Sequence, residues 1–201
     1  KLLGELLHRH RDGTIFIATK VPPKDWKWPG RAETPVADVF PSEHIREFTE
    51  KSLENLGVDC LDLQQLHVWS DAWVSDEGWQ RAVDDLKRQK LIRGFGISVN
   101  RWEPANVLRA IETGLIDSVQ VVYNIFDQNP EDDLFPACGA ADVAVIARVP
   151  FDEGSLTGTL SRDSTWPEGD WRNIYFTPAR LAEIVKDGLK GVIAKRTIQQ
   201  V

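Results

Sequence analysis

Segments typical of buried strands alternate with segments typical of amphipathic helices along almost the whole chain. The strand segments are apolar and rich in β-branched residues, as expected of parallel strands that are covered on both faces. The strands are predicted at residues 14–20, 59–67, 92–98, 118–122, 143–148 and 191–194. The helices are predicted near residues 1–13, 41–57, 77–90, 103–114, 131–141 and 177–190.

This strict alternation favours an α/β fold with a parallel sheet. The middle strand ends are separated by about 31, 23 and 27 residues, and each interval suits one strand and one helix. A complete eight-stranded barrel normally needs about 250 residues. Six such units in 201 residues therefore predict a truncated (β/α)8 TIM barrel, with an open doubly wound sheet as the alternative. No GxGxxG follows any predicted strand, which argues against a Rossmann dinucleotide site.

The composition is that of a globular protein and excludes several other classes. A net charge of −7 and a pI near 5.1 disfavour binding to nucleic acid. No window is apolar enough for a membrane helix, and no signal peptide opens the sequence. Cys60 and Cys138 lack the spacing of metal ligands, so free thiols in the cytoplasm are expected.

Because methionine is absent, Lys1 is not expected to be a translational start. We expect one domain, residues 1–201, that is incomplete at both ends.

Polar side chains stand at the ends of the predicted strands. They are Lys20, His67, Ser98, Asn100, Gln120, Tyr123 and Arg148. In a barrel the C-terminal strand ends surround one mouth, where active sites lie, so these residues are predicted to converge. Lys20 and His67 fall on neighbouring strands, close enough to act on one small substrate. Taken singly, each residue has a plainer interpretation: a solvated charge, a turn residue, or a histidine bonded in the core.

Aromatic loops and the scarcity of ligating residues narrow the chemistry further. Trp26 and Trp69 are predicted to form an apolar wall of the substrate site, because pockets are commonly lined with aromatic side chains; surface packing is the alternative. A metal-dependent hydrolase would need several histidines or carboxylates at the strand ends, and only His67 stands there. We therefore predict no metal site.

Several stretches together resemble the aldo-keto reductase family. They are "IFIATK", "SLENLGVDCLDLQQLH", "LIRGFGISVN", "SVQVVYNIFDQ" and "GVIAKRTIQQV", in family order across nearly the whole chain. The stretches "YNIFDQ" and "ARVPFDEGSLTG" are most similar to the bacterial, broad-specificity oxidoreductase branch. The resemblance implies a (β/α)8 barrel that reduces aldehyde or ketone carbonyls with NADPH, and hence a small-molecule carbonyl substrate.

The resemblance also implies a role for each matched residue. Lys20 resembles the family's catalytic lysine, which favours the ionised form of a proton-donating tyrosine, and His67 resembles the histidine that orients the carbonyl. The remaining matches concern the cofactor: Ser98, Asn100 and Gln120 for the nicotinamide carboxamide, Tyr123 for the nicotinamide face, Arg148, Leu156 and Gly158 for the pyrophosphate, and Lys195, Arg196 and Thr197 for the adenosine 2′-phosphate.

The sequence also departs from the family pattern. The family's catalytic aspartate and tyrosine, and its first two strands, fall before the segment where this sequence begins, and one late helix is expected to be missing between Val185 and Gly191. A non-catalytic barrel that binds NADPH as a regulatory or redox-sensing subunit, or an inactive remnant, is therefore the alternative function. The natural substrate and the oligomeric state stay open.

Overall fold

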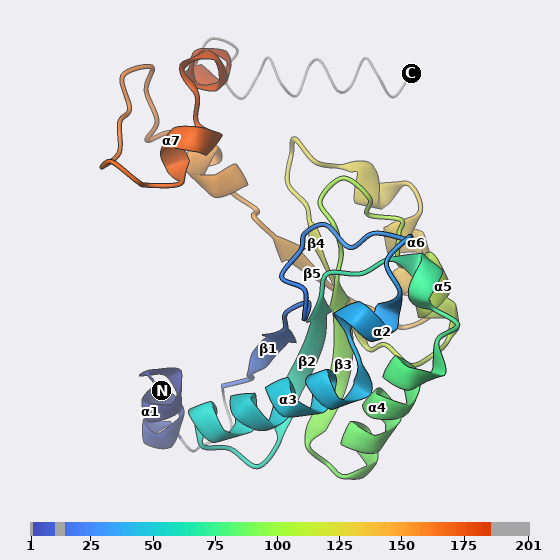
Figure 1. Cartoon of the computed structure of the whole chain (residues 1–201). Helices are drawn as coiled ribbons and strands as arrows, with labels where there is room; N and C mark the ends of the chain where they lie inside the picture. The colour runs from blue at the N-terminus through green and yellow to red at the C-terminus, as the bar shows by residue number, and fades with distance from the viewer. Residues whose placement is uncertain (1, 11–14, 186–201) are drawn as a thin grey trace. The chain divides into compact units, whose positions relative to one another are not determined.

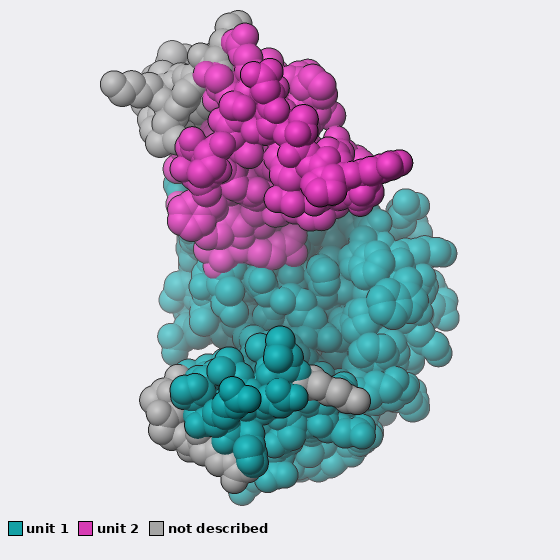
Figure 2. All heavy atoms as spheres, turned by 90° about the vertical axis from the view of Figure 1, so that its left-hand side faces the viewer, with its two compact units in different colours: residues 1–121, 129–146 teal, residues 122–128, 147–201 magenta. Residues whose placement is uncertain are grey.

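The computed structural model describes residues 2–10 and 15–185 (Figure 1). The chain divides into two compact units, drawn in separate colours in Figure 2. The first unit comprises residues 1–121 and 129–146, and the second comprises residues 122–128 and 147–201. This division into compact units does not test the prediction of one domain over residues 1–201, which stays a prediction.

Five strands form one sheet in chain order, β1-β2-β3-β4-β5. Their bounds are β1 Ala18–Val21, β2 Leu61–His67, β3 Ile92–Ser98, β4 Ser118–Val122 and β5 Ala144–Arg148. The pairs β1–β2, β2–β3 and β3–β4 are all parallel, which confirms the α/β prediction. Consecutive parallel neighbours of this kind are the pattern of a barrel wall. The sixth predicted strand, residues 191–194, lies outside the described residues.

The first strand is shorter than the predicted range of residues 14–20. Its ladder begins only at Ala18. Before it, the backbone N–H of Ile17 donates to the Asp62 carboxylate at 2.9 Å rather than to a backbone carbonyl. A side-chain acceptor thus takes the place of the ladder bond that would have extended the strand.

Two long helices match their predictions closely. Helix α3 (Ser42–Leu56) ends at Gly57, whose φ of 68° is the left-handed conformation that glycine adopts without steric cost. Helix α4 (Glu77–Arg88) begins after Asp76, whose carboxylate accepts from the backbone N–H groups of the first turn. The two helices contact one another, and they pack on β1 and β3 respectively (Figure 1).

The other helices are short. They are α1 Leu2–Arg9, α2 Val36–Val39, α5 Leu108–Glu112, α6 Leu134–Ala140 and α7 Arg172–Tyr175, with 3-10 turns η1 Asp71–Trp73, η2 Asn129–Glu131 and η3 Asp152–Thr157. Residues 178–185 are also helical. Helix α5 is shorter than the predicted 103–114 because Val107 (φ −157°, ψ 0°) interrupts helical geometry and the preceding residues form turns.

The core lies between the sheet and its helices. Val21, Leu66, Ile97 and Val119 occupy one register row across β1–β4, and all four are fully buried. Trp79 of α4 packs against Phe95 of β3 and against Trp69. Each such side chain stabilises the fold by roughly 1.5–3 kcal/mol through burial. This row fixes which face of each strand meets helices. None of the helices among residues 2–10 and 15–185 is long and apolar enough to cross a membrane.

Candidate active site

The face of the sheet opposite the core row is polar. In the parallel register, Lys20 pairs with Gln65, Gln65 with Gly96, and Gly96 with Ser118. Two residues further along the strands, His67 pairs with Ser98, and Ser98 with Gln120. Side chains alternate between the faces of a strand, so all of these point to the same side. The register therefore brings Lys20, His67, Ser98 and Gln120 onto one face, in two adjacent layers at the C-terminal end.

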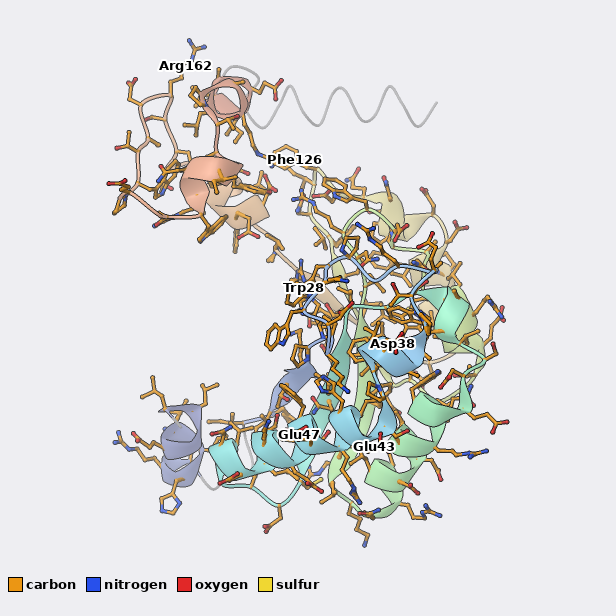
Figure 3. The ribbon with its side chains drawn as sticks, viewed as in Figure 1. Trp28, Asp38, Glu43, Glu47, Phe126 and Arg162 are labelled. Carbon is orange, nitrogen blue, oxygen red and sulfur yellow. The ribbon has the colours of Figure 1, made fainter. Side chains whose placement is uncertain are left out.

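His67 lies beside an aromatic loop. Its ring is half-buried, and its centroid is 6.4 Å from that of Trp28. Trp28 in turn makes an edge contact with Trp26, at 5.9 Å between centroids. Trp28 lies just beyond the end of β1 (Figure 3). Trp26 is 63% exposed. The loop after β1 thus presents apolar surface next to the histidine.

Trp69 has a different environment from the one expected. Its side chain is fully buried, with edge contacts to Trp73 and Trp79, and its indole N–H donates to Asp71 Oδ1 at 3.0 Å. The structure therefore places Trp69 in the helix-covered core. The aromatic composition of the sequence could not distinguish this tryptophan from Trp26, because only packing decides which ring is covered.

Ser98 and Gln120 have polar groups in unusual situations. Ser98 is fully buried, and its Oγ has no hydrogen-bond partner in the described part of the chain. A buried hydroxyl without a partner is costly and uncommon in folded proteins. The side-chain oxygen of Gln120 accepts a hydrogen bond from Gln65 Nε2 at 3.3 Å. These two side chains could both serve an amide-bearing ligand.

Asn100 is engaged by the surrounding loops. Its Nδ2 donates to Glu103 Oε2 at 2.9 Å and, at the long limit of hydrogen bonding, to the carbonyl oxygens of Gly30 (3.4 Å) and Trp69 (3.5 Å). The N–H of Gly30 donates back to Asn100 Oδ1 at 3.4 Å. Asn100 thus joins the loops after β1, β2 and β3, and binding to a cofactor would compete with these contacts.

A cavity of about 680 Å³ opens between the same three loops. This size is within the usual range for small-molecule sites. Lys20 and His67 do not line it. Its wall includes Gly30, Arg31, Ser70, Asn100, Trp102 and Glu103.

The second unit contains seven of the predicted cofactor residues, and four of them are among the described residues. The backbone N–H of Tyr123 donates to the carbonyl of Arg148 at 3.1 Å, which joins the two strand ends. Leu156 is half-buried in η3, and Gly158 ends that turn with a φ of 74°. Lys195, Arg196 and Thr197 lie outside the described residues. The structure therefore brings Tyr123 and Arg148 together and leaves the 2′-phosphate prediction untested.

Asp152 organises the loop that carries Leu156 and Gly158. It is buried and accepts from Ser155 Oγ at 2.6 Å, Tyr175 Oη at 3.0 Å and Arg180 at 3.1 Å. A carboxylate with this many donors is held in one position. From the sequence, Asp152 is interpreted only as a loop cap, because its partners Tyr175 and Arg180 are more than twenty residues away along the chain.

The described residues contain no group of three or more His, Cys, Asp or Glu side chains that could hold a metal ion.

Comparisons with known proteins give a consistent result. The family model described as "Aldo/keto reductase family" matches residues 1–192. An uncharacterized oxidoreductase of Bacillus subtilis is 32% identical over 164 residues, covering 78% of this chain and 48% of that protein. The NADH-specific methylglyoxal reductase of Escherichia coli is 29% identical, covering 60% of this chain and 37% of its own length. An aldo-keto reductase of Schizosaccharomyces pombe, named with NADP(+), is 29% identical and covers 79% and 45%.

Solved structures also match. The glycerol dehydrogenase of Gluconobacter oxydans has a TM-score of 0.68 at 26% identity, covering 96% of this chain and 62% of that one. A holo aldo-keto reductase of Bacillus halodurans has a TM-score of 0.61 at 29% identity, covering 84% and 52%. This chain spans about half the length of the curated relatives it matches.

Proposed function

This chain belongs to the aldo/keto reductase family, and we propose that it supplies part of the active site of a carbonyl reductase that uses a nicotinamide cofactor. The observation that supports the proposal best is the polar sheet face. Its Lys20, His67, Ser98 and Gln120 lie in two adjacent layers of one register. The C-terminal ends of barrel strands are where barrel enzymes place their chemistry. The activity, the substrate and the partners are properties of the whole protein. This chain spans about half the length of its relatives.

The residues of the first unit fit a nicotinamide carboxamide. Ser98 Oγ is buried without a partner and can both donate and accept a hydrogen bond. Gln120, in the next strand at the same level, has its oxygen bonded to Gln65, so its NH2 group points away from that residue. The bound cofactor would supply the reducing equivalents. Ser98 and Gln120 would orient the ring, and Asn100 would contribute after it exchanges its present contacts.

His67 and Lys20 would act on the substrate. Carbonyl reduction builds negative charge on oxygen, and a hydrogen bond to that oxygen stabilises the transition state more than the ground state. The His67 ring would donate this bond. The Lys20 cation would favour the ionised form of a neighbouring acid and help to deliver its proton. Trp26 would contact the apolar part of the substrate.

We further propose that NADPH is preferred to NADH, through Lys195, Arg196 and Thr197. Each charge-assisted hydrogen bond is worth about 1.5–3 kcal/mol, so two such bonds to the 2′-phosphate give a preference of at least about a hundredfold. The relatives include one named for NADH and one named for NADP(+), so the comparison needs a direct measurement. Fluorescence titration of the whole protein with both cofactors tests the preference. Equal affinities would mean that this cationic segment does not contact the phosphate.

Replacing His67 tests the catalytic assignment. In the whole protein, His67→Ala should lower the turnover of aldehydes by about two to four orders of magnitude and leave NADPH affinity almost unchanged, because the lost hydrogen bond acts on the developing oxyanion. His44→Ala is the matched control. His44 is a buried histidine of α3 bonded to the Pro22 carbonyl at 2.8 Å, so its loss should reduce stability and spare turnover in the folded enzyme.

Two outcomes would reject the catalytic assignment. If His67→Ala kept wild-type turnover, the histidine would have a structural role. If the whole protein bound NADPH but reduced no aldehyde or ketone, it would be the regulatory or sensing barrel instead.

A further inference from the structure

Strand β2 contains two neighbouring glutamines, Gln64 and Gln65, and both are fully buried. Adjacent residues of a strand face opposite sides, so only one of them can face the helices. Gln64 does. Its Oε1 accepts from Thr19 Oγ1 at 2.9 Å, and its Nε2 donates to Thr49 Oγ1 of α3 at 3.0 Å. Both the oxygen and the NH2 group of this amide are hydrogen-bonded, and Gln64 thereby links the sheet to helix α3.

Gln65 faces the polar side and is bonded at one end only. Its Nε2 donates to Gln120 Oε1 at 3.3 Å. Its Oε1 is buried without a hydrogen-bond partner among the described residues. An apolar side chain of similar size would avoid burying an unpaired oxygen. An apolar side chain at position 65 could fill the same space, but it could not donate the hydrogen bond to Gln120.

The bond crosses an intervening strand. Gln65 lies on β2 and Gln120 on β4, with β3 between them. The β3 residue in register with Gln65 is Gly96. A Cβ atom at Gly96 would lie 3.3 Å from Gln65 Cγ and 2.3 Å from Ser118 Oγ. The missing side chain of Gly96 thus leaves the space through which Gln65 reaches Gln120.

We propose that Gln65 is a positioning residue that fixes the orientation of the Gln120 amide. An amide is planar, with its oxygen and its NH2 group on opposite arms. Because Gln65 donates to the oxygen, the NH2 arm of Gln120 is turned away from Gln65. Gln120 is then presented to the nicotinamide as a donor to the carboxamide oxygen. This inference rests on the proposed function of Gln120 as a cofactor ligand.

The test uses the whole protein and its affinity for NADPH, measured by fluorescence quenching. Gln65→Met, which keeps the side-chain length, should weaken NADPH binding by about three- to tenfold, the value of one neutral hydrogen bond. In a Gln120→Leu background the same substitution should change the dissociation constant less than twofold, because its effect is transmitted only through Gln120. Gln65→Leu serves as a second variant if Gln65→Met folds poorly.

Gln64→Leu is the matched control. It removes an equally buried glutamine from the same strand, so it should lower the urea midpoint while leaving the NADPH dissociation constant within twofold. Gln65→Glu gives an independent readout. A carboxylate accepts from the Gln120 NH2 group and turns the oxygen toward the cofactor. The 3-acetylpyridine analogue lacks the carboxamide NH2 that this oxygen would accept from. Relative to the wild type, Gln65→Glu should therefore weaken the binding of the analogue more than the binding of the nicotinamide cofactor.

The outcomes separate the two proposals. If Gln65→Met weakens binding equally with and without Gln120, or not at all, the positioning role is wrong and the proposed function stands. If the wild-type whole protein binds no nicotinamide cofactor, the proposed function fails, and the positioning role fails with it.

Discussion

Gly96→Ala should destabilise the protein although it adds only one methyl group. The new Cβ would lie 2.3 Å from Ser118 Oγ and 2.8 Å from the Ser118 carbonyl oxygen, whereas ordinary carbon contacts lie near 3.5–4.0 Å. The hydroxyl can rotate, but the carbonyl belongs to the backbone of β4, so the two strands must separate. Overpacking of a well-filled site costs about 1–3 kcal/mol. The reduced entropy of the unfolded chain offsets about 0.4–1 kcal/mol of this.

Urea unfolding of the whole protein measures the effect. A loss of about 1–2 kcal/mol moves the midpoint by roughly 0.5–1 M for a urea dependence of about 2 kcal/mol/M. Gly139→Ala is the matched control, because Gly139 is exposed in α6 and a Cβ there meets no atom within 4 Å. It should be neutral or stabilise slightly. If the two substitutions shifted the midpoint alike, the close approach of β3 and β4 at Gly96 would be refuted.

Three further predictions concern individual side chains. Burial raises the pKa of the Cys138 thiol, whereas Cys60 is partly exposed, so Cys60 should react first with a thiol reagent and the difference should vanish in urea. Hydrogen bonds from Arg172 hold the pKa of Asp170 at about 2, below its ordinary value. The pair therefore stabilises the fold above about pH 4, and this stabilisation is lost as the pH falls toward 2. Carboxyl NMR of Arg172→Gln should show the pKa of Asp170 rising toward its usual range. Asp76→Ala removes the cap of α4 and should cost about 1 kcal/mol in urea unfolding, and equal stability of the two proteins would argue against the cap.

The sequence predicted the elements and the polar face because both follow from local periodicity. Short apolar runs rich in β-branched residues mark the strands. Lys20, His67, Ser98 and Gln120 stand at or near the C-terminal ends of four of them. In a parallel sheet these ends meet at one edge, so the order along the chain is enough to place them together. The family resemblance pointed to the same residues.

Other features depend on packing and were out of reach. Trp26 and Trp69 have the same side chain, yet the first is exposed and the second lies among Trp73 and Trp79. Asn100 stands near a strand end, as a ligand would, but its amide is engaged by Glu103 and neighbouring loops. Such differences arise from contacts between segments distant in sequence, which no local pattern records.

The polar face also contains buried oxygens that lower the stability of the fold. Gln65 Oε1, Ser98 Oγ and Ser118 Oγ all lie on this face, are buried, and make no hydrogen bond within the described residues. The opposite face, by contrast, pairs the amide of Gln64 at both ends. Apolar substitutes for three unpaired oxygens would be more stable, since each costs about 1–3 kcal/mol. Unmet hydrogen-bonding capacity gathered on one face, in the layers that hold Lys20 and His67, is the arrangement expected where a polar ligand completes the bonds.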